Sequence, residues 1–159
     1  MRLTSFSDYS LRVLMYLAAD PGRRATIAEI ATVFGVSEHH LVKVAHFLGK
    51  CGWLLTVRGK GGGVELGMPA DAICVGEVVR QAEGDPVMAE CFGDGEVDCA
   101  IAGACRLRGV FVEAVDALYA VLDRYSLADI VGSPQLARVL RFESPAAGAA
   151  IRQERHGIS

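Results

Sequence analysis

The sequence lacks an apolar stretch long enough to cross a bilayer, although apolar residues make up 52% of its 159 residues. Arg12 interrupts the first long apolar stretch, and Glu113 and Asp116 interrupt a later one. No run reaches the roughly 18 residues that a membrane helix needs. The segment Met1–Ser5 has no apolar signal core. We therefore expect a cytoplasmic protein with no membrane partner and with enough apolar content for a folded core.

The sequence also lacks the cysteine patterns of two common structural sites. Its five cysteines are an odd number, which in a cytoplasmic protein argues against a disulfide framework. It contains none of the C-x2–4-C pairs that are usual in zinc sites. A constellation of nucleophile and general base is missing as well, so we do not expect an enzyme.

The net charge of −3 is unevenly distributed along the chain. Residues 1–70 carry eight Lys or Arg and five Asp or Glu, whereas residues 71–159 carry eight and fourteen. A positive N-terminal half beside a negative C-terminal half can bind a polyanion through one face. The charge pattern therefore permits DNA binding by the N-terminal part of the chain.

Helical periodicity predicts three helices in the first fifty residues. The first runs from about Ser7 to Ala19. Thr26 and Glu29 fit a capping box at the start of the second helix, and Gly35 stops it. Ser37 is then expected to cap the third helix.

The third predicted helix has an apolar face and a basic face. Its inward positions at helical spacing are Leu41, Val44, Ala45 and Leu48. Its outward positions are His39, Lys43, His46 and Lys50. Two helices joined by a short glycine-containing turn are a helix-turn-helix pattern, and the alternative is a solvated face with no ligand. The residues expected to face DNA are Ser37, His39, His40 and Lys43, of which the two histidines could reach base edges.

A glycine-rich turn follows, flanked by two strand-like runs. Residues 53–58 and 64–66 surround the glycine-rich residues 59–63, which predicts a hairpin. Behind a recognition helix such a hairpin is a wing, and Arg58, Lys60 and Gly61 lie where its tip would meet phosphates or a minor groove. A phosphate loop of a nucleotide-binding protein is the rival interpretation. Such a loop leads into a helix with a Lys-Ser/Thr pair, whereas a strand follows here.

The expected fold class is mainly α with a small β wing, in four regions. Residues 1–70 form a winged helix-turn-helix DNA-binding region, 71–104 a linker helix and a cluster-binding loop, 105–132 a long dimerisation helix, and 133–159 a loosely ordered tail. The long helix is expected from Cys105 to Tyr125. Its apolar face comprises Leu107, Val110, Phe111, Ala114, Leu118, Val121, Leu122 and Tyr125. We expect this face to pair with its copy in a homodimer; packing within one chain is the alternative.

Cys91, Cys99 and Cys105 follow the spacing C-x7-C-x5-C, from an irregular acidic segment to the start of the long helix. Three thiolates on such a segment can wrap a soft metal centre. The spacing leaves an iron–sulfur cluster, zinc and unliganded thiols open, and a carboxylate, a histidine or water would have to complete a cluster. Cys51 and Cys74 lie among apolar neighbours and are expected to be buried free thiols.

Four segments together resemble one known family. MRLTSFSDY at 1–9, HLVK at 40–43, VRGKGGG at 57–63 and ACRL at 104–107 are similar to the Rrf-type winged-helix transcription regulators, and among these to the NsrR-like nitric-oxide-sensing iron–sulfur repressors. The resemblance covers about residues 1–131. It implies a homodimer that binds a near-palindromic operator in double-stranded DNA and releases it when nitric oxide reaches a 4Fe–4S cluster.

The resemblance also implies the cluster ligands. These are Cys91, Cys99 and Cys105 of one chain, together with Asp8 of the partner subunit. Relatives with a 2Fe–2S cluster have a histidine where this chain has Arg108, which disfavours that ligand set. The gap between Cys91 and Cys99 is longer than the expected pattern. The alternative function is an iron–sulfur or redox-status regulator, with a 2Fe–2S or other cluster and without specificity for nitric oxide.

Overall fold

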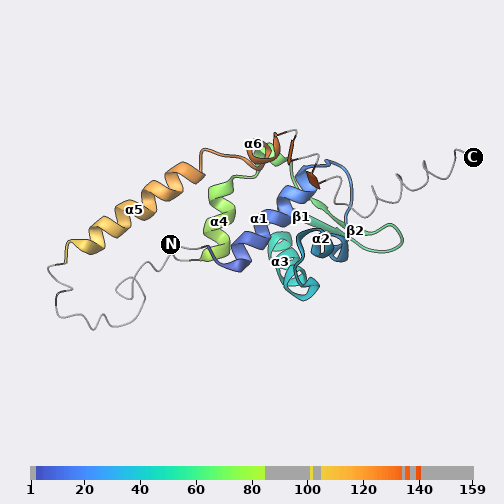
Figure 1. The fold of residues 1–159 in the computed structure, drawn as a ribbon, viewed down its shortest axis with the longest axis horizontal. Helices are drawn as coiled ribbons and strands as arrows, with labels where there is room; N and C mark the ends of the chain where they lie inside the picture. The colour runs from blue at the N-terminus through green and yellow to red at the C-terminus, as the bar shows by residue number, and fades with distance from the viewer. Residues whose placement is uncertain (1–2, 85–100, 102–104, 134, 137–138, 141–159) are drawn as a thin grey trace, which may run out of the picture.

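The structure, a computed structural model, describes residues 3–84, 101, 105–133, 135–136 and 139–140. It confirms the expected fold class, because a small two-stranded hairpin follows a helix-turn-helix unit and a long helix lies outside it (Figure 1). In chain order the elements are α1 (Ser5–Ala18), α2 (Ile27–Phe34), α3 (Glu38–Lys50), β1 (Leu54–Val57), β2 (Gly63–Leu66), the 3-10 turn η1 (Ala70–Ala72), α4 (Val75–Glu83), α5 (Leu107–Leu122) and α6 (Leu127–Val131).

The helix α1 lies at the centre and packs against α3, α4 and α6. At its N-cap, the Thr4 hydroxyl accepts a hydrogen bond from the Ser7 amide at 3.2 Å. The helix therefore begins at Ser5, two residues before the predicted start, because the capping residue precedes the apolar pattern on which the prediction was based. Its fully buried side chains include Val13 and Leu14.

The helices α2 and α3 form the helix-turn-helix unit. The Thr26 hydroxyl accepts a hydrogen bond from the Glu29 amide at 3.1 Å, and Gly35 ends α2 in a left-handed conformation with φ of 62°. Ser37 occupies the N-cap position of α3, as predicted, but its side chain makes no capping hydrogen bond. The Ser37 side chain is exposed, and water can serve the first amides of the helix in its place.

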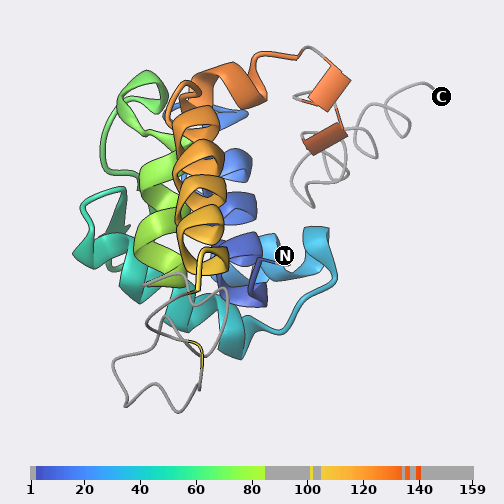
Figure 2. The ribbon, with the colours of Figure 1, turned by 90° about the vertical axis from the view of Figure 1, so that its left-hand side faces the viewer.

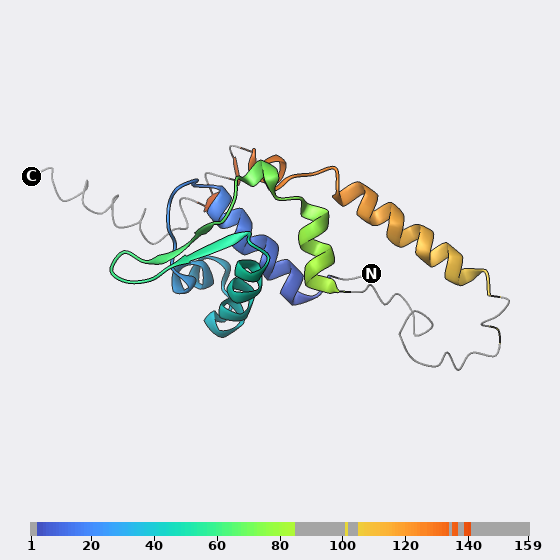
Figure 3. The same cartoon turned by 180° about the vertical axis from the view of Figure 1, so that it is seen from behind.

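The wing is an antiparallel hairpin in which Leu54 pairs with Leu66 and Val57 with Gly63. Residue Ala25, just before α2, extends it, because its amide donates to the Val64 carbonyl at 3.1 Å and its carbonyl accepts from the Val64 amide at 2.8 Å. These two bonds fix the base of the hairpin to the helix-turn-helix unit. The hairpin then projects beyond α2, away from α5 (Figure 3).

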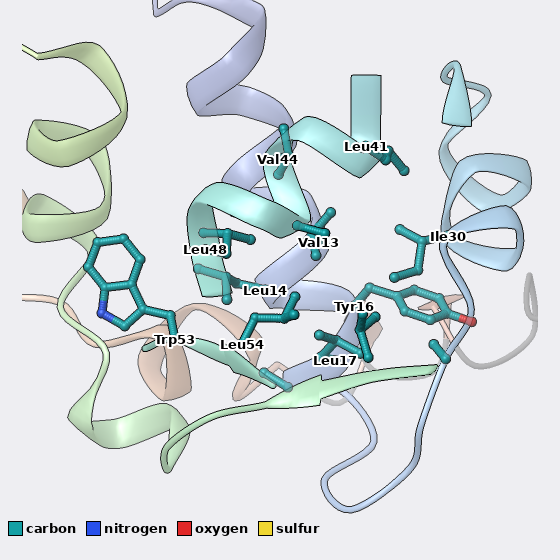
Figure 4. Packing of buried hydrophobic residues seen from close by; sticks show 14 of the residues in the cluster. Val13, Leu14, Tyr16, Leu17, Ile30, Leu41, Val44, Leu48, Trp53 and Leu54 are labelled. Carbon is teal, nitrogen blue, oxygen red and sulfur yellow. The ribbon is translucent and has the colours of Figure 1, made fainter. Parts of the chain in front are cut away.

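The core lies where α1, α2, α3 and β1 meet, and the buried side chains of these elements point toward one another (Figure 4). The predicted inward face of α3 is confirmed: Leu41, Val44 and Leu48 are at most 1% exposed and Ala45 is 8% exposed. Burial of each such leucine contributes about 1.5–3 kcal/mol. The orientation of α3 on α1 is therefore set by apolar packing.

The helix α4 lies between α1 and α5 (Figure 1), and in the side view α5 lies in front of it (Figure 2). Its N-terminal end is joined to the segment after α5, since the Val75 amide donates to the Tyr125 carbonyl at 2.9 Å. Arg80 reaches across to Asp123 at 2.9 Å and stacks over the Tyr119 ring at 4.4 Å. These contacts anchor the C-terminal end of α5, while its N-terminal end extends outward (Figure 1).

The helix α5 is shorter than predicted, and its apolar face is largely exposed. It spans Leu107–Leu122, so the predicted bounds of Cys105 and Tyr125 are wrong by two and three residues. On the predicted face, Leu107, Val110, Val121 and Tyr125 are 45–56% exposed. Tyr119, which the predicted face did not include, is the buried residue of this helix. The residues that the structure describes therefore cover the predicted face only in part.

The start of the predicted tail contacts the core. Leu140 is 6% exposed, and Leu136 packs against the same buried cluster. Residues 134, 137–138 and 141–159 lie outside the described residues. In the part of the chain that the structure describes, no helix has the length and apolar character of a membrane span.

Replacing Gly76 with alanine should destabilise the protein by about 1–3 kcal/mol. A Cβ atom there would lie 1.9 Å from Asp123 Oδ1 and 2.9 Å from the Asp123 amide nitrogen, so the contact between α4 and the end of α5 must open. Gly49→Ala is the matched control, because its Cβ would make an ordinary contact at 3.7 Å and alanine favours a helix. Thermal melting of both variants checks this. Equal melting temperatures would contradict the close contact at Gly76.

Candidate nucleic-acid interface and metal ligands

The outward face of α3 is polar and accessible. As predicted, His39, Lys43, His46 and Lys50 are all exposed, and they lie opposite the buried face of the helix. Such a helix can enter a major groove with its N-terminal residues at the base edges. The face is therefore suited to a polyanion.

The two histidines at the start of α3 have different surroundings. The His40 ring stacks with Tyr9 of α1, with ring centroids 6.3 Å apart and an angle of 21° between the planes. Its centroid is 6.2 Å from that of His39. His39 thus lies on the outward face, whereas His40 lies beside α1 and connects the recognition helix to it.

The wing tip carries two exposed cations. Arg58, Lys60 and Gly61 are exposed, and the Gly62 amide closes the turn by donating to the Gly59 carbonyl at 2.9 Å. Gly61 has φ of 78°, a conformation that favours glycine over residues with a side chain. Within the described part of the chain, none of the ion pairs engages Arg58, Lys60 or Lys43. These cations can therefore contact phosphates.

Asp8 lies in the first half of α1 and forms an ion pair with Arg12 at 2.8 Å. The Asp8 and Arg12 side chains remain 44% and 42% exposed, so the pair contributes about 0.5 kcal/mol or less to stability. A second chain can consequently reach the carboxylate at little cost.

The N-terminal end of α1 is fixed to the end of α4 through Glu83. One Glu83 carboxylate oxygen accepts hydrogen bonds from the Thr4 amide at 2.8 Å and the Thr4 hydroxyl at 3.1 Å. Burial acts to raise the pKa of Glu83, but hydrogen bonds from Ser7 and Thr4 outweigh it and hold this pKa below its ordinary value. Glu83 thus stays ionised at neutral pH and holds the first turn of α1.

Aromatic side chains connect the same turn of α1 to α3. Phe6 meets Phe47 of α3 edge to face, with ring centroids 5.1 Å apart, and Phe47 in turn meets Trp53 at 6.2 Å. Together with the Tyr9–His40 stack, these contacts place Asp8 between two residues that touch the recognition helix. A displacement of this turn must therefore disturb α3, because packed aromatic rings transmit strain.

The structure describes three of the five cysteines, all of them free thiols: Cys51, Cys74 and Cys105. Cys105 is half-buried and stands just before α5, whereas Cys91 and Cys99 lie outside the described residues. Among the described residues no three His, Cys, Asp or Glu side chains form a group that could hold a metal ion.

Cys51 and Cys74 are half-buried, so the expectation of full burial is wrong in degree. Burial raises the pKa of the Cys51 thiol, and the charge of Glu77 adds to this effect. The Cys74 sulfur lies 3.7 Å from the Asp123 carboxylate. The raised pKa of Cys51 disfavours its thiolate, which is the form that binds metals.

Two contacts that orient the site were missed in the sequence. The Thr4–Glu83 bonds span 79 residues and the Arg80–Asp123 pair spans 43. Helical periodicity reports neighbours three or four residues apart, so it carries no signal for such distant pairs.

Comparison with known proteins identifies the family of this chain. The Rrf2 family, described as an iron-dependent transcriptional regulator, matches residues 3–133. The chain is 47% identical over 132 residues to the HTH-type transcriptional regulator NsrR of Bacillus subtilis (strain 168), covering 82% of this chain and 90% of that protein. It is 40% identical over 146 residues to the regulator of the same name from Shouchella clausii (strain KSM-K16), covering 91% and 98%.

Solved structures agree with this assignment. The structure of CymR (YrzC), the global cysteine regulator of B. subtilis, is similar with a TM-score of 0.66 and 28% identity, over 83% of this chain and 97% of that one. T. potens IscR is similar with a TM-score of 0.65 and 25% identity, over 83% and 87%. The chain, with its helix-turn-helix unit, wing and outer helix, belongs to the Rrf2 family and is a DNA-binding transcriptional regulator rather than an enzyme.

Proposed function

We propose that this chain is a homodimeric repressor that senses nitric oxide through an iron–sulfur cluster, most simply a 4Fe–4S cluster, and releases its operator in response. The observation that carries the proposal is the position of Asp8, between Phe6 and Tyr9, which both contact the recognition helix. The iron-dependent character of the family and the relatives named NsrR support it.

The proposed ligands are Cys91, Cys99 and Cys105, completed by Asp8 of the partner subunit. The described donors fit this group, because Cys105 is a free, half-buried thiol and the Asp8 carboxylate is accessible. Thiolates suit iron–sulfur clusters, whereas a carboxylate is a weak, exchangeable ligand for them. When bound, the cluster would supply iron that reacts with nitric oxide.

The partner in the homodimer would cover the exposed face of α5. Three large apolar side chains of this face, Leu107, Val110 and Val121, are 45–56% exposed, and a contiguous exposed apolar surface marks an interaction site. A second copy offers the same face, which gives the self-complementary contact of a two-fold dimer. In this arrangement residues 105–132 form the dimerisation region.

The signal would pass through α1. Asp8 of each chain would be held at the other chain's cluster, and loss of this ligand would remove one restraint from the first turn of its own α1. Phe6 and Tyr9 then carry the displacement to Phe47 and His40 on α3. The two recognition helices, which would read successive major grooves about one turn apart, lose their matched separation. The DNA-free arrangement has to be favoured by a few kcal/mol for such a switch to work.

The proposal is tested with full-length protein purified without oxygen. The protein is titrated with nitric oxide and, separately, with hydrogen peroxide, while its retention on operator DNA is followed at fixed salt. We expect nitric oxide to release the DNA at a low ratio of nitric oxide to iron and peroxide to act far more weakly. Equal responses would favour the redox-status regulator with a 2Fe–2S or other cluster, and iron-free protein would contradict both functions.

Asp8→Ala should leave a cluster that is lost several-fold faster on exposure to air, because the carboxylate ligand is gone. The fold should persist, since the Asp8–Arg12 pair is exposed and contributes little. Visible absorbance against time and iron content check this. Asp71→Ala, which removes an exposed carboxylate of η1, is the control; identical decay of the two variants would exclude Asp8 as a ligand.

Cys105→Ala should abolish iron binding, whereas Cys51→Ala should retain it. The surroundings of Cys51 raise its thiol pKa and so disfavour the thiolate that a cluster needs. Iron and acid-labile sulfide are measured per chain after anaerobic purification. Retention of iron in the Cys105 variant, or its loss in the Cys51 variant, would show that the ligand set is wrong.

Lys60→Gln should weaken DNA binding uniformly across sequences and make the slope of log K against log salt concentration less negative by about 0.9 per lost phosphate contact. Lys60 is exposed at the wing tip, where a phosphate can reach it. Fluorescence anisotropy at several salt concentrations measures the slope. Arg124→Gln, at the end of α5, is the control of equal charge change; the same change in slope for both variants would exclude a wing contact.

A further inference from the structure

One apolar side chain interrupts the polar outward surface of α3. Val42 is 56% exposed, whereas its neighbours Leu41 and Val44 are 1% and 0% exposed. At 100° per residue, Val42 lies three residues after His39 and four before His46. It therefore shares the accessible side of the recognition helix with these two exposed histidines.

The packing of the chain does not account for a valine at this position. The side chain is more than half exposed, so it adds little to the core. Valine is also a poorer helix former than alanine, lysine or glutamate, which would suit an exposed helical site better. Because the Val42 side chain lies on the same accessible side of α3 as His39, Lys43 and His46, it can contact a ligand of this surface.

The major groove offers one apolar group for such a side chain. Every base edge presents hydrogen-bond donors or acceptors there, and thymine alone adds a methyl group at C5. The exposed Lys43 and Lys50 of α3 outnumber the exposed Glu38 of its first turn, so this side of the helix can still attract phosphates. Residues in the N-terminal half of a recognition helix are those that meet base edges, and Val42 lies in the N-terminal half of α3 (Glu38–Lys50).

We propose that Val42 determines sequence specificity by packing against the 5-methyl group of a thymine in each half-site of the operator. The contact discriminates against cytosine, adenine and guanine at that position, because none of them offers a methyl group there. The inference rests on the part of the proposed function in which α3 reads DNA. The contact does not depend on iron or nitric oxide. Its test can therefore fail while nitric oxide sensing is confirmed, and nitric oxide sensing can fail while the contact is confirmed.

The test starts with anaerobically purified full-length protein and a pool of duplexes with random sequence. Binding sites are selected with the wild type, with Val42→Ala and with Leu55→Ala. The last is the matched control, because Leu55 is 51% exposed on the wing strand β1. The best wild-type duplex is then synthesised with each thymine replaced in turn by deoxyuridine, which lacks only the methyl group.

For the wild type and for Leu55→Ala, we expect one thymine per half-site whose replacement by deoxyuridine lowers affinity about fourfold, the value for burial of one methyl group. For Val42→Ala this ratio should fall close to one, and the selected sites should lose that thymine. Melting should show that the variant is folded, since the side chain is exposed.

Two outcomes would overturn the proposal: a wild type that is indifferent to every thymine methyl group, or a Val42→Ala protein that keeps the fourfold ratio. If Val42→Ala bound no duplex, Val42→Thr would decide. Threonine keeps one of the two methyl groups of valine. If the contact exists, the ratio of affinities for the thymine and deoxyuridine duplexes should lie between one and four. A ratio of four or a ratio of one would contradict the proposal.

Discussion

The structure depends most on the packing of α1 against the recognition helix. The inner face of α1 forms the core with α2, α3 and β1, so the DNA-reading surface cannot be repositioned without moving α1. The first turn of the same helix carries Asp8, and its neighbours Phe6 and Tyr9 touch α3. The helix α1 thus provides the core against which the recognition helix packs, and it also carries the proposed cluster ligand Asp8.

The N-terminal and C-terminal parts of the chain differ in charge and in what they contribute to the structure. The cations of α3 and the wing are exposed and lie within the net-positive part of the chain, residues 1–70. The acidic half supplies α5, which is anchored at its C-terminal end through Arg80 and Asp123. Glu83 holds the start of α1 to the end of α4, so α1 and α4 form one unit. A helix anchored at one end can set the separation of two heads in a dimer.

Local signals predicted the DNA-reading part of the fold well. The inward and outward faces of α3 and the hairpin at the glycine-rich turn follow from periodicities of a few residues, and the structure has both. The bounds of α5 and the missing Ser37 cap were not predictable, because they depend on tertiary contacts. Tyr119 is buried where Arg80 covers its ring, a pairing that no local pattern encodes. The cysteine spacing left an iron–sulfur cluster, zinc and unliganded thiols open, and two of the three cysteines, Cys91 and Cys99, lie outside the described residues.

Hydrogen–deuterium exchange of the dimer, measured without oxygen before and after exposure to nitric oxide, tests the coupling through α1 most directly. We expect faster amide exchange in the first turns of α1 and in α3, while the base of the hairpin, where Ala25 pairs with Val64, exchanges as before. Release of DNA with unchanged exchange in both α1 and α3 would contradict the claim that this helix carries the signal.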